Sequence, residues 1–131
     1  MTDRKLLELA AMAYWGSEID DVCSIRWLEE DQCIGYTHAD NQDHNGNDVE
    51  LCWNPLLDDG DAFRLAVKLR MLVDIRYRSP GAIRYNSVTY WVDPLLGQVI
   101  EFGDMETCLR AATRRAIVRA AAEMAKQEVK V

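Results

Sequence analysis

The sequence lacks any apolar run that approaches the roughly 20 residues a helix needs to span a bilayer. Its first residues, Met1–Lys5, carry charges of both signs and lead into an amphipathic pattern, without the apolar core and cleavage site of a signal peptide. Internal repeats and low-complexity linkers are also missing. These absences predict a cytoplasmic protein that forms one α+β domain over residues 1–131 and has no membrane partner.

Basic residues are nearly absent from positions 18–61, where Arg26 is the single one among many carboxylates. The formal net charge of the chain is −7, which disfavours tight non-specific binding to duplex DNA because such binding depends on neutralising phosphates. Most of the arginines fall within positions 64–119. An acidic first half and a basic second half predict two faces of opposite charge, unless the acidic loops are simply solvated.

The cysteines and histidines lack the paired spacing that marks a zinc site. They are Cys23, Cys33, Cys52, Cys108, His38 and His44. We therefore expect no metal and no cofactor, and the reducing cytoplasm disfavours disulfides. A glycine-rich phosphate loop and a G-x-S-x-G elbow are also absent from the sequence.

One group of side chains has the composition for general acid–base chemistry: His38, Asp40, Asp43 and His44, all within the polar stretch His38–Asp48. A polar loop of this composition is more often merely exposed to solvent. An enzyme that acts on a phosphoester or a nucleotide through this loop is therefore the alternative hypothesis, and we assign no catalytic residue.

Hydrophobic periodicity predicts the elements of the fold. Apolar residues spaced three and four apart predict helices over 3–15, 59–71 and 105–127. Alternation predicts strands over 22–28, 33–37, 49–53, 73–78, 83–92 and 98–102, with a bulge near Asn86-Ser87. We expect an α+β fold in which a three-stranded antiparallel meander and a small hairpin are packed by N-terminal, central and C-terminal helices.

The segment from Trp53 to Leu69 joins a sharp loop to an amphipathic helix. Asn54-Pro55 ends the preceding strand because proline pushes the residue before it into extended geometry, and Asp58 or Asp59 can then cap the helix. This segment and the alanine-rich stretch Cys108–Glu123 resemble the phage ABA sandwich group of small phage and prophage proteins and its NinX-like relatives. The resemblance implies a phage setting and a sheet sandwiched by helices, and it implies no activity.

Arginines and aromatic residues share the predicted meander. Alternation places Tyr77 and Tyr85 on one face and Arg76, Arg78 and Arg84 on the other. Arginines beside an aromatic platform can hold a phosphate and a nucleobase. The predicted ligand-binding residues are Arg76, Arg78, Arg84 and Trp91, and the alternative is a solvated outer face of the sheet.

The acidic region predicts a second kind of surface. Its carboxylates could cover a basic, nucleic-acid-binding surface of a host protein. The predicted partner-binding residues are Asp40, Asp43, Asp48, Asp58 and Asp59. On the last helix, Ala111, Val118 and Ala122 form a face of small, uncharged residues that predicts pairing with a second subunit, and hence a homo-oligomer.

We therefore expect a phage or prophage accessory protein without catalytic activity that is directed against host defence. It would bind a host protein through its acidic surface, or sequester an anionic nucleotide signal at the arginine–aromatic site. This functional expectation follows from association with small acidic phage proteins, and the fold itself implies no function.

Overall fold

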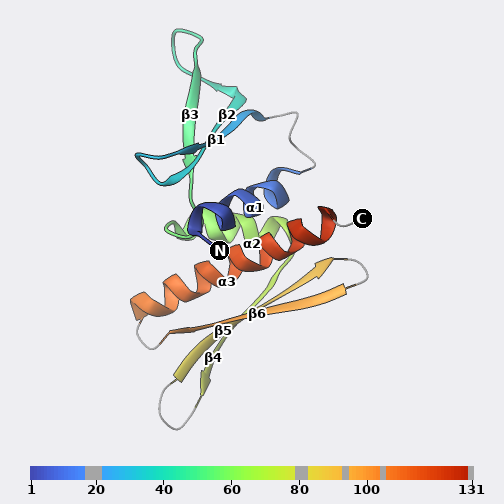
Figure 1. Ribbon diagram of the computed structural model, residues 1–131. Coiled ribbons are helices and arrows are strands. Elements are labelled where there is room, and N and C mark those ends of the chain that lie inside the picture. Colours follow the sequence, from blue (N-terminus) through green and yellow to red (C-terminus); the bar gives the residue numbers. More distant parts are fainter. Residues whose placement is uncertain (17–21, 79–82, 93–94, 104–105, 130–131) are drawn as a thin grey trace.

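The computed structural model describes the backbone of residues 1–16, 22–78, 83–92, 95–103 and 106–129. Side chains are described for these residues except 22–24, 38–41, 75–78, 83–92, 95–96, 102–103, 106–109 and 128–129. Two antiparallel sheets lie at opposite ends of the molecule, and three helices lie between them (Figure 1). The predicted α+β class, with N-terminal, central and C-terminal helices, is confirmed.

The first sheet is a meander in the order β1-β2-β3. Its strands are β1 (Val22–Leu28), β2 (Cys33–Gln42) and β3 (Asp48–Trp53). Ile34 lies directly opposite both Trp27 and Trp53, so these three positions share one face of the sheet. That face packs against α1, because Ile34 and Trp53 belong to the buried core. The predicted hairpin is thus extended by β3 into a three-stranded sheet.

The far ends of β2 and β3 project from the body as an arm (Figure 1). The prediction of a loop over His38–Asp48 is wrong for residues 38–42, which continue β2, so that only residues 43–47 form the turn. In this turn Asp43 Oδ1 accepts two backbone hydrogen bonds, at 2.8 and 3.0 Å. Backbone pairing extends the strand through this polar stretch, with His38 opposite Val22 of β1 and Gln42 opposite Asp48 of β3, and the register with β3 shifts between Thr37 and Gln42.

Capping side chains begin the first two helices. The hydroxyl of Thr2 accepts a hydrogen bond from the backbone N–H of Lys5 at the start of α1 (Asp3–Trp15). Asp58 accepts one from the backbone N–H of Asp61, at 2.7 Å, at the start of α2 (Asp59–Lys68). The predicted capping of the second helix is therefore confirmed, with Asp58 as the cap.

Asn54 organises the turn between β3 and α2. Its side-chain amide donates to the backbone carbonyl of Gln32 at 2.8 Å, and its Oδ1 accepts from the backbone N–H of Leu56 at 3.0 Å. Its own backbone N–H donates to Asp61 at 3.0 Å. Asn54 is buried, and these bonds satisfy polar groups that would otherwise have lost their water. The hydrogen bonds of Asn54 therefore fix where α2 begins.

The second sheet is the predicted meander, in the order β4-β5-β6. Its strands are β4 (Leu72–Arg78), β5 (Ile83–Val92) and β6 (Leu95–Gly103). Its register runs without a shift over the paired residues, with Val88 opposite both Val73 and Val99. The predicted bulge near Asn86-Ser87 is therefore wrong.

The helix α3 (Glu106–Val129) covers the face of this sheet that carries Val99 and Glu101. Arg119 of α3 donates to Glu101 at 2.6 Å. On the other face, Leu72 and Ile100 are exposed, which is consistent with the alternation of β4 and β6. The second sheet is therefore covered by a helix on one side only among the described residues (Figure 1).

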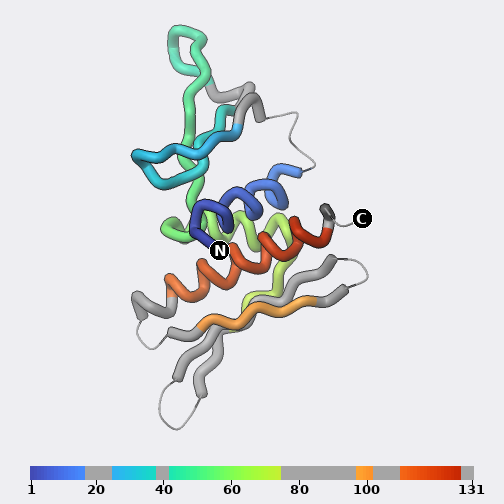
Figure 2. The backbone as a smooth tube through the Cα atoms, viewed as in Figure 1, coloured from blue at the N-terminus to red at the C-terminus, as the bar shows by residue number. Residues whose placement is uncertain are grey.

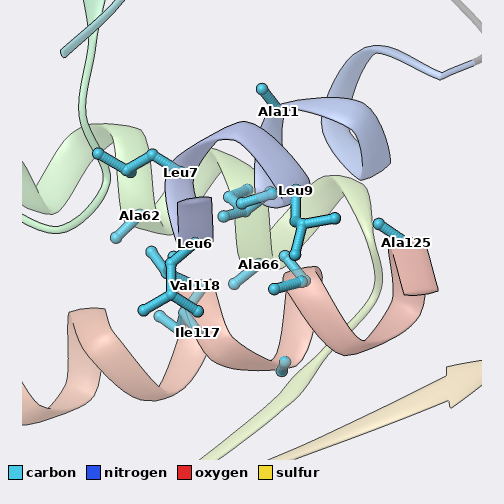
Figure 3. Packing of buried hydrophobic residues seen from close by; sticks show 14 of the residues in the cluster. Leu6, Leu7, Leu9, Ala11, Ala62, Ala66, Ile117, Val118 and Ala125 are labelled. Atoms are coloured by element: carbon cyan, nitrogen blue, oxygen red, sulfur yellow. The ribbon is translucent and has the colours of Figure 1, made fainter. Parts of the chain in front are cut away.

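On the side that faces away from the second sheet, α3 is covered by α1. Although the ends of the sequence supply these two helices, they pack side by side (Figure 2). Leu6 of α1 lies beside Ile117 and Val118 of α3, and Leu7 and Leu9 belong to the same buried cluster (Figure 3). Among the described side chains of α3, the buried ones are Ala112, Ala116, Ile117, Val118, Ala120, Ala121, Ala122, Met124 and Ala125.

This arrangement corrects the predicted subunit interface. Val118 and Ala122 were assigned to a second copy, yet they are 0% and 1% exposed because α1 of the same chain covers them. Small residues do allow close helix approach, as predicted, but the approaching helix is intramolecular. Ala111, the third residue of that predicted face, is exposed, so the sequence argument for a homo-oligomer loses two of its three residues.

A disulfide joins Cys33 of β2 to Cys52 of β3, with Cα atoms 6.0 Å apart. The expectation that the chain lacks disulfides is wrong for this pair. Cys33 is buried and Cys52 is exposed, so the bond can be reached from solvent at one end. Among the described residues, no helix combines the length and apolar character needed to cross a membrane.

Candidate functional site

The predicted arginine–aromatic residues do not converge. The register pairs Arg76 with Tyr85 and Tyr77 with Arg84, so backbone position 84 lies on the opposite face from the other two arginines. The prediction that three arginines share one face is therefore wrong. Backbone position 91 lies six residues along β5 from position 85, roughly 20 Å at about 3.3 Å per residue. A single nucleotide could not contact all four positions, and their side chains lie outside the described residues.

Two of the predicted partner-binding carboxylates have structural roles at the start of α2. Asp58 is the helix cap. Asp59 lies 2.6 Å from Arg114 Nη1 and 3.8 Å from Arg110 Nη1, and the Nε of Arg114 also donates to the backbone carbonyl of Leu56, at 2.8 Å. These bonds attach the turn after β3 to α3, so the carboxylates stabilise the fold.

The other predicted carboxylates belong to the projecting arm. Every residue from Gln42 to Glu50 is exposed, including Asp43 and Asp48. Hydrogen bonds from the backbone N–H groups of Asn47 and Asn45 hold the pKa of Asp43 below its usual range, so this carboxylate keeps its charge. The side chain of Asp40 lies outside the described residues. The arm is therefore an exposed acidic projection, as the sequence predicts.

The described residues show no cluster of the predicted histidines and aspartates. His44 is exposed in the turn of the arm, and His38 belongs to β2, where its backbone lies opposite Val22. The side chains of His38 and Asp40 lie outside the described residues. Among the described side chains, no three histidines, cysteines or carboxylates come together as metal ligands.

A groove of about 510 Å³ runs between α2 and α3. Ala62, Ala66 and Ile117 line it, and all three are part of the buried core. Phe63 and Val67 also line it, yet their side chains are 69% and 59% exposed. They lie one helical turn apart and form an apolar ridge beside the groove. We call Phe63, Val67 and the groove they border the α2–α3 groove.

The sequence contained a signal for this ridge. The predicted core face of the second helix was Ala62, Leu65, Ala66 and Leu69, and the structure buries the first three of these fully. Phe63 and Val67 fall outside that face, although both are apolar. A large aromatic residue on the solvent face of an amphipathic helix is typical of a binding surface when a second apolar residue adjoins it.

The rim of the α2–α3 groove is basic, although the chain as a whole is acidic. Arg70, Arg110 and Arg114 line the groove with one carboxylate, Asp59. Arg70 is exposed, and none of the described carboxylates lies within ion-pair distance of it. Arg110 is 59% exposed, and its one ion pair with a described side chain is the long contact with Asp59. The groove therefore combines apolar walls with a positive rim.

Arg70 has an unfavourable backbone conformation. Its φ is +55°, in the left-handed region that costs a non-glycine residue about 1 kcal/mol or more. It ends α2: the backbone N–H of Arg70 donates to Val67 at 3.2 Å, and that of Met71 to Ala66 at 2.9 Å. This pair of bonds is the Schellman motif, whose left-handed position is usually glycine.

Replacing Arg70 with glycine is therefore expected to stabilise the fold by roughly 0.5–1 kcal/mol, because glycine adopts the left-handed region without steric cost. Urea denaturation of the Arg70→Gly variant measures the gain. Arg70→Ala provides the matched control, since alanine removes the charge but keeps the steric cost and should show no such gain. Equal stabilities for the glycine and alanine variants would contradict this account.

Comparison of the chain with protein-family models, with curated proteins and with solved structures found no match. The resemblance to phage ABA sandwich and NinX-like proteins therefore stays a prediction from the sequence.

Proposed function

We propose that the protein is a non-catalytic binding protein whose α2–α3 groove holds an amphipathic helix of a partner protein. The observation that carries the proposal is the exposure of Phe63 and Val67 directly beside an apolar groove. Recognition of a helix in a groove uses an apolar face with anchors one turn apart. A ridge of two apolar residues one turn apart on α2 offers a matching surface to such a face.

The charge of the rim defines the partner more closely. Three arginines and one carboxylate line the groove, while the chain has a formal net charge of −7. A partner helix with acidic residues beside its apolar anchors would be attracted to this rim and repelled by the rest of the surface. We therefore propose an acidic amphipathic helix as the bound segment.

The resemblance to small phage and prophage proteins supports a bacterial host protein as the partner. Binding would then act by occupying a helix that the host protein needs for its own contacts. The projecting acidic arm is a second surface on the same molecule, and the experiment must distinguish it from the groove.

Photo-crosslinking in bacterial lysate tests this proposal. A photoreactive amino acid replaces Val67 in the groove in one variant and Val49 in the arm in another; both side chains are exposed. We expect the variant at position 67 to crosslink a host protein, with the crosslinked peptide coming from an acidic amphipathic helix. A synthetic copy of that helix should then bind the wild type.

Two sets of variants assign the binding to a surface. The double variant Phe63→Ala with Arg70→Glu should lower the affinity for the peptide by at least about tenfold, since an aromatic anchor and a rim charge are removed together. Asp43→Asn with Asp48→Asn should leave the affinity unchanged. Loss of binding in the arm variant, with binding retained in the groove variant, would contradict the groove and favour the acidic arm.

A further inference from the structure

A second hollow, of about 450 Å³, lies between α1 and the first sheet. Its walls are apolar and aromatic, with Trp15 and Met12 from α1 and Trp27 from β1. The volume is in the range of small-molecule sites, which are mostly apolar and carry a few polar groups. It shares no lining residue with the α2–α3 groove. An inference drawn from it is therefore independent of the proposed function.

A cation of the protein itself lies over the ring of Trp27, one of the residues that line the hollow. The guanidinium carbon of Arg4 is 5.5 Å from the centroid of the Trp27 ring, and its Nε is 3.1 Å from Oε1 of Glu8. Glu8 is one of the residues that line the hollow. The indole N–H of Trp27 donates to Glu29 at 2.8 Å, so a hydrogen bond holds the edge of the ring while its face contacts Arg4. An aromatic face beside a carboxylate attracts organic cations.

Arg26 also lines the hollow, and its positive charge is balanced by a carboxylate. Alternation along β1 places position 26 on the opposite face of the sheet from Trp27. There its guanidinium donates two hydrogen bonds to Glu50, each of 2.8 Å, so that its charge is balanced locally. Of the two charged residues that line the hollow, Glu8 and Arg26, Glu8 is then the one that attracts a cation.

We propose that this hollow binds a small amphipathic organic cation, an aryl or alkyl group that carries an amidinium, guanidinium or ammonium. The apolar part packs between Trp15 and Met12. The cationic head takes the place of the Arg4 guanidinium between Trp27 and Glu8. Arg4 and Glu8 are 55% and 43% exposed, and exposed ion pairs are weak, so Arg4 is a displaceable internal competitor.

Isothermal titration calorimetry with two matched probes tests the proposal. Naphthalene-2-carboxamidine is a cation, and naphthalene-2-carboxamide is its neutral counterpart of nearly the same shape. We expect the amidine to bind at least about tenfold more tightly than the amide, since only the amidine gains the aromatic face and the carboxylate. Equal affinities, or no binding of the amidine, would overturn the proposal.

Substitution of Arg4, the internal competitor, gives the most specific test of the proposed site. Arg4→Ala should tighten amidine binding by about 3- to 10-fold, because the internal guanidinium no longer occupies the site. Lys5→Ala makes the same change of charge on the adjacent residue and should leave the affinity nearly unchanged. Glu8→Gln should abolish the preference for the amidine over the amide. A decrease in affinity for Arg4→Ala, or equal effects of Arg4→Ala and Lys5→Ala, would show that Arg4 does not compete. Thermal melting of each variant verifies that it is folded.

Discussion

Replacing Trp53 with alanine is expected to lower the free energy of unfolding by about 3–5 kcal/mol, the usual cost of deleting a buried large aromatic side chain. The Trp53 side chain is 2% exposed. Its ring stacks on Tyr14 at a centroid distance of 5.4 Å and lies 5.0 Å from Trp15, so its main aromatic partners come from α1. Domains of this kind are stable by about 5–15 kcal/mol, and the variant would lose a large share of that. Urea denaturation measures the effect.

The Trp53→Phe variant separates packing from the polar group. The buried indole N–H of Trp53 has no hydrogen-bond partner among the described residues, and an unpaired buried donor is itself unfavourable. Phenylalanine keeps an aromatic ring and removes that donor, so its cost should be well under half that of alanine. A melting temperature of Trp53→Ala within a degree or two of the wild type would show that the residue is a binding platform and not part of the scaffold.

Reducing the Cys33–Cys52 disulfide is expected to lower the free energy of unfolding by about 3 kcal/mol. The bond closes a loop with a sequence separation of 19 residues, and in the chain-entropy model such a loop contributes about this amount by restricting the unfolded chain. Urea denaturation with and without a reductant measures the difference. Because Cys52 is exposed, a small thiol reagent can reach the bond in the folded protein.

The Cys52→Ser variant isolates the covalent bond from the packing of the cysteines. Serine at this exposed position removes the bond with little other change, whereas a substitution of buried Cys33 would also alter the core. The variant should have the stability of the reduced wild type and should not respond to the reductant. If the wild type keeps its full stability after reduction, the contribution of this disulfide to the fold is refuted.

The sequence predicted correctly the elements whose bounds are set by residues within the same segment. The first helix has the predicted boundaries, Asp3–Trp15, because its cap and its apolar spacing lie within the segment itself. The strand Val22–Leu28 is likewise as predicted. The second helix was predicted to continue to Met71, yet it ends at Lys68. A left-handed arginine at position 70 is not an ending that sequence preferences would suggest.

Features that depend on distant segments could not be read from the sequence. Cys33 meets Cys52 because β3 pairs with β2. The polar residues between the two cysteines predicted a loop, so the sequence did not indicate this pairing. The small-residue face of α3 indicated close packing correctly, but only the tertiary structure shows that α1 provides the partner helix. Of the candidate sites, the acidic arm was predictable from charge, whereas both hollows require elements that come from separate parts of the chain.

The position of α3 between α1 and the second sheet affects the order of events during synthesis. About 90 residues separate Trp15, the last residue of α1, from Glu106, the first of α3. At roughly 5–20 residues per second, α1 waits on the order of 5–20 s for the helix that buries it. During that interval the side of α1 that faces α3, which includes Leu6, lacks its partner helix and presents an apolar surface to chaperones. The contact between α1 and α3 therefore forms only after residues 106–129 have emerged from the ribosome.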